Sequence, residues 1–174
     1  IRLFFSSSWA GPNFIVRGGI DILVAFQKLC RKYNNLELVL KCIVPDGLPE
    51  KCQEILKNYR DKIHIIEEKL SDSDMAELMS HMDIFLIPSA RIHVISILRA
   101  MAVGLPVVAS DGWGIEEYVQ DGVNGSIVEG RWGKASWIDG TGMLQENYPI
   151  MEQVDEIFAE CLADKIEELI LDEE

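Results

Sequence analysis

Short apolar segments alternate with segments of helical periodicity along the whole chain. The apolar segments are rich in Ile, Leu and Val and show no polar alternation, which predicts buried strands over residues 1–6, 36–44, 62–66, 84–87, 106–109 and 126–128. Strands of this kind, separated by helices, are typical of a parallel sheet covered on both faces. The pattern therefore predicts an α/β fold, a Rossmann-like doubly wound parallel sheet, in one domain that spans residues 1–174.

Apolar residues at helical spacing predict helices between the strands, over residues 21–30, 49–59, 71–82, 95–103, 115–119 and 154–169. Asp21 is expected to cap the first of these helices, and Ser71 begins a capping box for the third. Gly104 is expected to end the fourth in a left-handed conformation. Residues 129–150 carry Gly, Pro, Asn and two tryptophans without clear periodicity, so we expect a long loop inserted there.

Composition narrows the function classes. The formal net charge of −13 argues against nonspecific binding to nucleic acid or to anionic lipid. No apolar run approaches the roughly 20 residues of a membrane span. The cysteines form no CxxC pair and indicate reduced packing residues of a cytoplasmic protein, and no metal-ligand cluster is visible. Because the first residue is Ile1, in a strand, we expect the chain to be cut from a longer protein.

Parallel sheets of this class bind ligands beyond the carboxyl ends of their strands. The candidate site therefore lies in the loops at 5–8, 43–46, 66–70, 88–93 and 109–114. A helix that starts near His93 would present free amides and its positive dipole end to an anion, and Arg17 could pair with a diphosphate bidentately. Ser89 and Ser96 offer hydroxyls near the same mouth. The structural alternative for Arg17 is a solvent-exposed arginine in a Gly-rich turn.

The segment from Asp83 to Val128 resembles the C-terminal domain of retaining GT-B glycosyltransferases of family 4, also called group 1. The matching motifs, in the family's order, are Pro88-Ser89, Ala100-Met101-Ala102, Gly104-Leu105-Pro106-Val107-Val108-Ala109 and Asn124-Gly125. Upstream, Arg17-Gly18-Gly19 is similar to the family's Lys-Gly turn before its first helix.

The resemblance implies the donor-binding half of a two-domain enzyme that transfers a sugar, with retention, from a nucleoside diphosphate sugar to an acceptor in glycan or lipid biosynthesis. The acceptor site would belong mainly to an N-terminal domain absent from this chain. The nucleotide sugar is a substrate, and no cofactor or metal is implied. The donor-binding residues implied by the matched positions are Arg17, Gly18, Leu70, Ser89, Arg91, His93, Val94, Ile95, Ser96 and Arg99. The catalytic residues stay unassigned.

The chain departs from the family at its signature pair of glutamates, where Arg91 and Arg99 stand at the preserved spacing. Arginine only donates hydrogen bonds, so it cannot accept them from ribose hydroxyls as a carboxylate does. The two arginines could grip a more anionic donor, or they could mark a noncatalytic glycosyltransferase-like domain that binds a partner protein or a phosphorylated ligand. A sugar-nucleotide epimerase of the same fold is a third alternative, without assignable catalytic groups.

Overall fold

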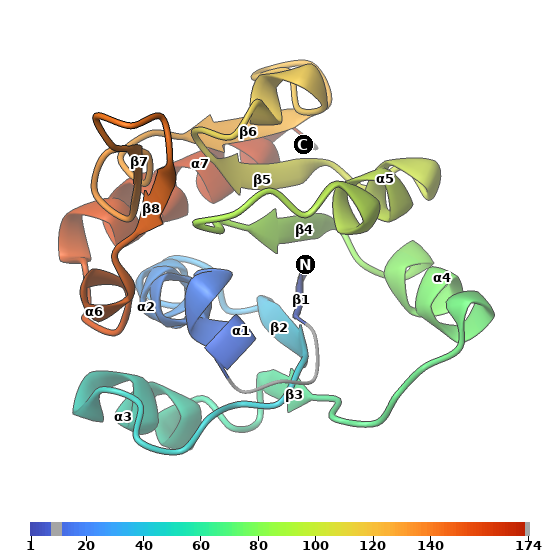
Figure 1. Ribbon diagram of the computed structural model, residues 1–174. Coiled ribbons are helices and arrows are strands. Elements are labelled where there is room, and N and C mark those ends of the chain that lie inside the picture. Colours follow the sequence, from blue (N-terminus) through green and yellow to red (C-terminus); the bar gives the residue numbers. More distant parts are fainter. Residues whose placement is uncertain (8–11, 173–174) are drawn as a thin grey trace.

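Six parallel strands form the central sheet of the computed structural model, which describes residues 1–7 and 12–172 (Figure 1). The strands are β1 (Arg2–Ser6), β2 (Glu37–Lys41), β3 (Ile63–Ile65), β4 (Ile84–Ile87), β5 (Val107–Ser110) and β6 (Gly125–Val128). Their order, β3-β2-β1-β4-β5-β6, reverses direction between β1 and β4. This confirms the predicted doubly wound parallel sheet and places its switch point where β1 and β4 end.

The predicted helices form, and the structure adds two short ones. The predicted helices are α2 (Gly19–Leu29), α3 (Glu50–Asn58), α4 (Asp72–Ser80), α5 (Val94–Ala102), the 3-10 helix η1 (Ile115–Glu117) and α7 (Glu156–Asp172). The Ser71 side chain accepts a hydrogen bond from the Asp74 amide, which confirms the predicted cap of α4. Gly104 follows α5 with φ of 80°, as predicted. The short helix α1 (Pro12–Val16) was not predicted, because five residues give too little periodicity.

Two apolar layers enclose the sheet, and the alternation of side chains along β1 assigns each to a face. Phe5 belongs to the larger layer, which buries α2, α3 and α7. Phe4 belongs to the other layer, which buries α5 and η1 and part of α4. Because both faces are covered, ligands reach the sheet only at its edges, where the loops lie.

Asp21 was expected to cap α2, but it does not. The N-cap position is Gly18, and Asp21 lies in the first turn with 3% of its surface exposed. Its carboxylate accepts a hydrogen bond from the Arg131 guanidinium, which is itself buried and stacks on the Phe158 ring at 4.1 Å. Burial raises the pKa of Asp21 to about 6, against the opposing effect of Arg131. The residue is a buried ion-pair partner, a role that the helix periodicity alone could not indicate.

We expected residues 129–150 to form one long irregular loop, but the segment contains regular elements. Strands β7 (Ser136–Ile138) and β8 (Leu144–Glu146) form an antiparallel hairpin, and the helix α6 (Tyr148–Met151) follows. Figure 1 shows the hairpin beyond the carboxyl ends of β4 and β5. The Ser136 hydroxyl donates to the Ala90 carbonyl at 2.8 Å, which fixes the hairpin to the loop after β4. The insert therefore borders the edge of the sheet where the sequence placed the candidate site.

Candidate functional site

Arg17 stands in the turn between α1 and α2 and faces the switch point of the sheet. Its Nη1 donates to the Ser6 carbonyl at the end of β1, at 3.1 Å. Its Nε is buried and finds no hydrogen-bond partner within residues 1–7 and 12–172. Burial lowers the pKa of Arg17 to about 10, which still leaves the side chain charged at neutral pH. A half-buried cation with an unused donor is a group that an anionic ligand would satisfy.

At Gly18 the chain passes too close to Pro88 for any side chain, and this close contact fixes the turn that carries Arg17. Gly18 has φ of 85°, and a Cβ there would lie 2.4 Å from the Pro88 carbonyl oxygen. The Gly18 amide donates to the Ile15 carbonyl at 2.9 Å, and the Ala90 amide to the Val16 carbonyl at the same distance. The Ala90–Val16 bond and the approach of Gly18 to Pro88 join the turn before α2 to the loop after β4, on both sides of the switch point.

The start of α5 forms the opposite wall of an open pocket of about 380 Å³, which is lined by Arg17, Ile92, His93, Val94, Ile95 and Ser96. The amides of Val94 and Ile95 precede the first hydrogen-bonded turn, so they have no partner within the helix. Together with the helix dipole they favour an anion at this point. The structure thus brings together five of the predicted donor-binding residues, Arg17, His93, Val94, Ile95 and Ser96.

His93 occupies the N-cap position of α5 and faces the same pocket. Its Nε2 is buried and without a hydrogen-bond partner among the described residues. Burial and the charges of Arg17 and Arg91 lower the pKa of His93 to about 4. The imidazole is therefore neutral at pH 7, and it can donate one hydrogen bond and accept another without adding charge.

Ser89 has a structural role in the loop after β4. The residue is 6% exposed, and its hydroxyl donates to the Val16 carbonyl at 3.3 Å and accepts from the Arg91 amide at 3.1 Å. Its carbonyl accepts from the Ser110 hydroxyl. Ser89 therefore fixes the loop that carries Arg91, and its hydroxyl does not line the pocket around Arg17.

Arg91 is paired with the insert. Its guanidinium donates two hydrogen bonds to the Glu146 carboxylate in β8 and one to the Tyr148 hydroxyl at 2.6 Å. The hydrogen bond from Arg91 lowers the pKa of Glu146, and that bond also raises the pKa of Arg91. Sequence reasoning missed Glu146 and Tyr148, because nothing local to 129–150 indicates that the hairpin returns to Arg91.

The remaining predicted residues lie outside the pocket around Arg17. Arg99, in the last turn of α5, donates to the Asp72 carboxylate at the start of α4, at 2.7 Å. Leu70 is half-buried in the loop between β3 and α4. Of the first predicted loop, 5–8, Ser8 lies outside the described residues.

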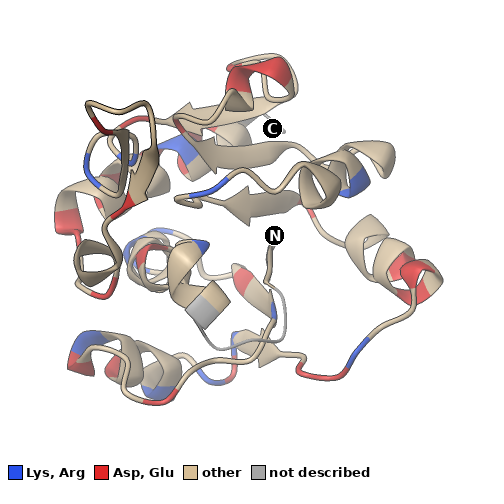
Figure 2. Ribbon diagram, in the orientation of Figure 1, with Lys and Arg blue, Asp and Glu red and all other residues tan. Residues whose placement is uncertain are grey.

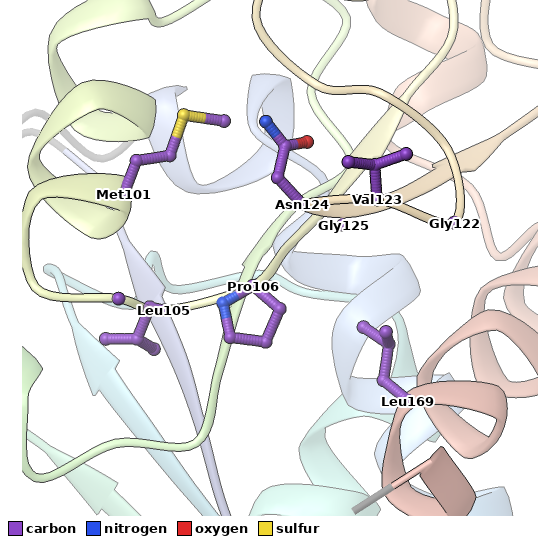
Figure 3. A pocket seen from close by; sticks show the side chains of 9 residues that line it. Met101, Leu105, Pro106, Gly122, Val123, Asn124, Gly125 and Leu169 are labelled. Carbon is purple, nitrogen blue, oxygen red and sulfur yellow. The ribbon is translucent and has the colours of Figure 1, made fainter.

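A second pocket, of about 440 Å³, opens at the opposite edge of the sheet, where β5 and β6 begin. Figure 3 shows the side chains that line it, from Met101, Leu105, Pro106, Val123, Asn124 and Leu169, with the backbone of three glycines. The lining contains no charged residue, so this pocket does not suit a diphosphate. The pocket around Arg17 is smaller but carries the charge and the free amides.

The described ranges contain no group of three or more His, Cys, Asp or Glu side chains placed to hold a metal ion. None of the helices in those ranges combines the length and the apolar character that crossing a membrane requires.

Comparison with known proteins assigns the chain to a family. Residues 12–147 match the model of the family described as "Glycosyl transferases group 1". Alpha-maltose-1-phosphate synthase of Mycobacterium tuberculosis (strain CDC 1551 / Oshkosh) is 34% identical over 103 residues, which make up 55% of this chain and 26% of that protein. The alignment thus spans about a quarter of the length of this relative.

Two solved structures show the same fold at low sequence identity. Pneumococcal O-GlcNAc transferase GtfA, in complex with UDP and GlcNAc, matches with a TM-score of 0.62 and 15% identity, over 98% of this chain and 30% of that one. The C-terminal domain of the glycosyl transferase group 1 protein LpcC from Francisella tularensis matches with a TM-score of 0.57 and 15% identity, over 98% of this chain and 83% of that one. The fold is that of the C-terminal domain of GT-B glycosyltransferases. Since the family model matches well over half of its residues, the chain belongs to the glycosyl transferases of group 1.

Proposed function

We propose that this chain is the donor-binding domain of a glycosyltransferase and that it binds the diphosphate of a nucleotide sugar between Arg17 and the start of α5. The observation that carries the proposal is the pocket that these two elements line. In it, a charged guanidinium, whose Nε has no partner among the described residues, lies opposite free helix amides. Positive charge and backbone donors are what a diphosphate requires. The complex of GtfA with UDP supports a nucleotide ligand for this fold.

In this proposal the chain stabilises the leaving nucleoside diphosphate while the bond to the sugar breaks. Arg17 and the amides of Val94 and Ile95 meet negative charge that grows on the diphosphate, and such preorganised groups supply a large part of catalysis. The acceptor is a glycan or lipid intermediate bound mainly by another domain, and closure of the two domains assembles the reaction centre. The sugar is transferred with retention, as the family resemblance implies.

The alternative of a noncatalytic domain that binds a partner protein or a phosphorylated ligand rests on Arg91 and Arg99, two cationic groups in place of acids. Each of them is paired with a carboxylate, Arg91 with Glu146 and Arg99 with Asp72. This pairing leaves little free positive charge at either position for a phosphorylated ligand. The observation that favoured the alternative therefore no longer separates it from donor binding.

Replacement of Arg17 tests the proposal directly. We expect Arg17→Ala to weaken the binding of the preferred nucleoside diphosphate at least tenfold, because a hydrogen bond to a charged group contributes roughly 1.5–3 kcal/mol. Arg31→Ala, which removes an exposed arginine just after α2, is the matched control and should leave the Kd unchanged. Isothermal titration of both variants decides the matter: equal affinities would exclude Arg17 from the site.

A further inference from the structure

The two faces of the β7–β8 hairpin differ in what they cover. Ser136 pairs with Glu146, and Ile138 pairs with Leu144. Cross-strand partners share a face, as do alternate residues on one strand, so these four side chains lie on one side of the hairpin. Since Ser136 bonds to Ala90 and Glu146 to Arg91, this side turns toward the loop after β4.

Glu146, Arg91 and Tyr148 form a polar cluster on that side. Glu146 accepts hydrogen bonds from Arg91 and from the Tyr148 hydroxyl, and its side chain is 11% exposed. The pKa of Glu146 is lowered, first by the bond from Arg91, so the carboxylate is ionised at neutral pH. The Arg91 side chain is 48% exposed, and its Nη1 donates no hydrogen bond within the described part of the chain. The cluster thus keeps donors and acceptors free for a ligand.

The cluster stands beside the pocket around Arg17. Arg91 and His93 line one small cavity together, and the charge of Arg91 contributes to the lowered pKa of His93. His93 in turn lines the pocket around Arg17. A ligand anchored by its diphosphate at the start of α5 would therefore reach Arg91 and Glu146 with the group attached to that diphosphate.

Charge decides which chemistry suits each half of this surface. Among residues 1–7 and 12–172, Arg17 is paired with no carboxylate, whereas the charge of Arg91 is neutralised by Glu146. An anion gains little from a neutral pair, but hydroxyl groups can donate to the carboxylate and accept from the guanidinium. The exposed Ile138 and Tyr148, at 59% and 40%, add apolar surface beside the pair. A neutral pyranose offers both hydroxyls and apolar C–H faces.

We infer that Arg91, Glu146 and Tyr148 form the subsite for the neutral sugar of the donor. The insert 129–150 then recognises the sugar, while Arg17 and α5 bind the diphosphate. The inference rests on the proposed function. Within it, Glu146 accepts from sugar hydroxyls and positions Arg91, and Tyr148 orients the carboxylate. The hairpin is thus a specificity element supplied by a segment 55 residues beyond Arg91.

The test separates the sugar from the nucleotide. Kd values are measured by titration calorimetry for UDP, GDP and ADP, and for UDP-glucose, UDP-N-acetylglucosamine, GDP-mannose and ADP-glucose. In the wild-type protein, we expect one nucleotide sugar to bind tighter than its own nucleotide. Glu146→Gln should weaken the binding of that nucleotide sugar about tenfold and change the Kd of the nucleotide less than twofold. Glu152→Gln, an exposed glutamate just after α6, is the control and should change neither.

Tyr148→Phe guards against a folding artefact, since it removes one hydroxyl and keeps the ring. It should reduce the preference for the nucleotide sugar in the same direction, with an unchanged midpoint of thermal unfolding. Equal affinity of the wild-type protein for nucleotide and nucleotide sugar would overturn the inference alone. So would an equal loss of both ligands in Glu146→Gln, or identical behaviour of Glu146→Gln and Glu152→Gln. If no nucleotide binds at all, the proposed function fails first and the inference fails with it.

Discussion

Three arginines at the candidate site have similar sequence signals but different surroundings. Arg91 and Arg99 are both 48% exposed and each donates to a carboxylate from another element, Glu146 or Asp72. Arg17 donates to a backbone carbonyl, and its Nε stays unused within the described residues. The same residue type therefore supplies free charge at one position only, which is the reason to assign the diphosphate to Arg17.

Two glycines have similar backbone angles but differ in the space around them, so their replacement compares the cost of a left-handed backbone with the cost of a steric clash. Gly18 and Gly104 have φ of 85° and 80°, but a Cβ would meet Pro88 only at Gly18, while nothing lies within 4 Å at Gly104. Gly104→Ala should lower the free energy of unfolding by about 1–2 kcal/mol, the cost of the left-handed conformation. Gly18→Ala should cost roughly 1–3 kcal/mol more, because the turn must move away from Pro88. Urea denaturation measures both, and equal losses would contradict the close approach.

At the level of elements, the insert 129–150 is tied to the sheet by a buried ion pair. Arg131 and Asp21 are 5% and 4% exposed at their side chains, and they join the base of the insert to α2. Arg131 also packs over Phe158 in α7, and its amide donates to Asp111 at 2.8 Å. Arg131 therefore holds the insert to α2, to α7 and to the loop after β5.

Removal of one partner should be costly, because the other charge stays buried. We expect Arg131→Met to lower the free energy of unfolding by about 3–5 kcal/mol, since Asp21 would lose the partner that opposes its desolvation. Lys134→Met is the control in the same segment. The Lys134 side chain is 53% exposed, and its salt bridge to Asp155 should contribute less than about 1 kcal/mol. Chemical denaturation of the two variants compares them, and similar losses would show that the buried pair does not fix the insert.

The strands and most helices were predictable because their signals are local. The apolar segment of β4 and the capping box at Ser71 both lie within a few residues of the elements that they specify. The pairs Asp21–Arg131 and Arg91–Glu146 join residues 110 and 55 positions apart, so only the folded chain reveals them. Arg17, His93 and the start of α5 could be named as candidates because ligands bind beyond the carboxyl ends of parallel strands, and their role in binding stays a prediction.

At the scale of the whole molecule, the charged residues behind the net charge of −13 are unevenly distributed. Figure 2 shows acidic positions on α4 and α7, and both acidic and basic positions on α2 and α3. Three glutamates of α7 pair with lysines: Glu156 with Lys51 in α3, Glu160 with Lys28 in α2, and Glu167 with Lys32 in the turn after α2. These pairs help α7 to close over α2, and Arg17 remains a local cation in an acidic protein.

The central claim is that the carboxyl edge of the sheet binds a nucleoside diphosphate, and a thermal-shift titration tests it most directly. The protein is titrated with UDP, GDP, ADP, CDP, dTDP and inorganic pyrophosphate. We predict that one nucleotide stabilises it selectively, by roughly 2.7 kcal/mol at a concentration near 100 times its Kd. Pyrophosphate should act more weakly than that nucleotide, because it lacks the nucleoside. No stabilisation by any nucleotide, or equal stabilisation by pyrophosphate and all of them, would contradict the account.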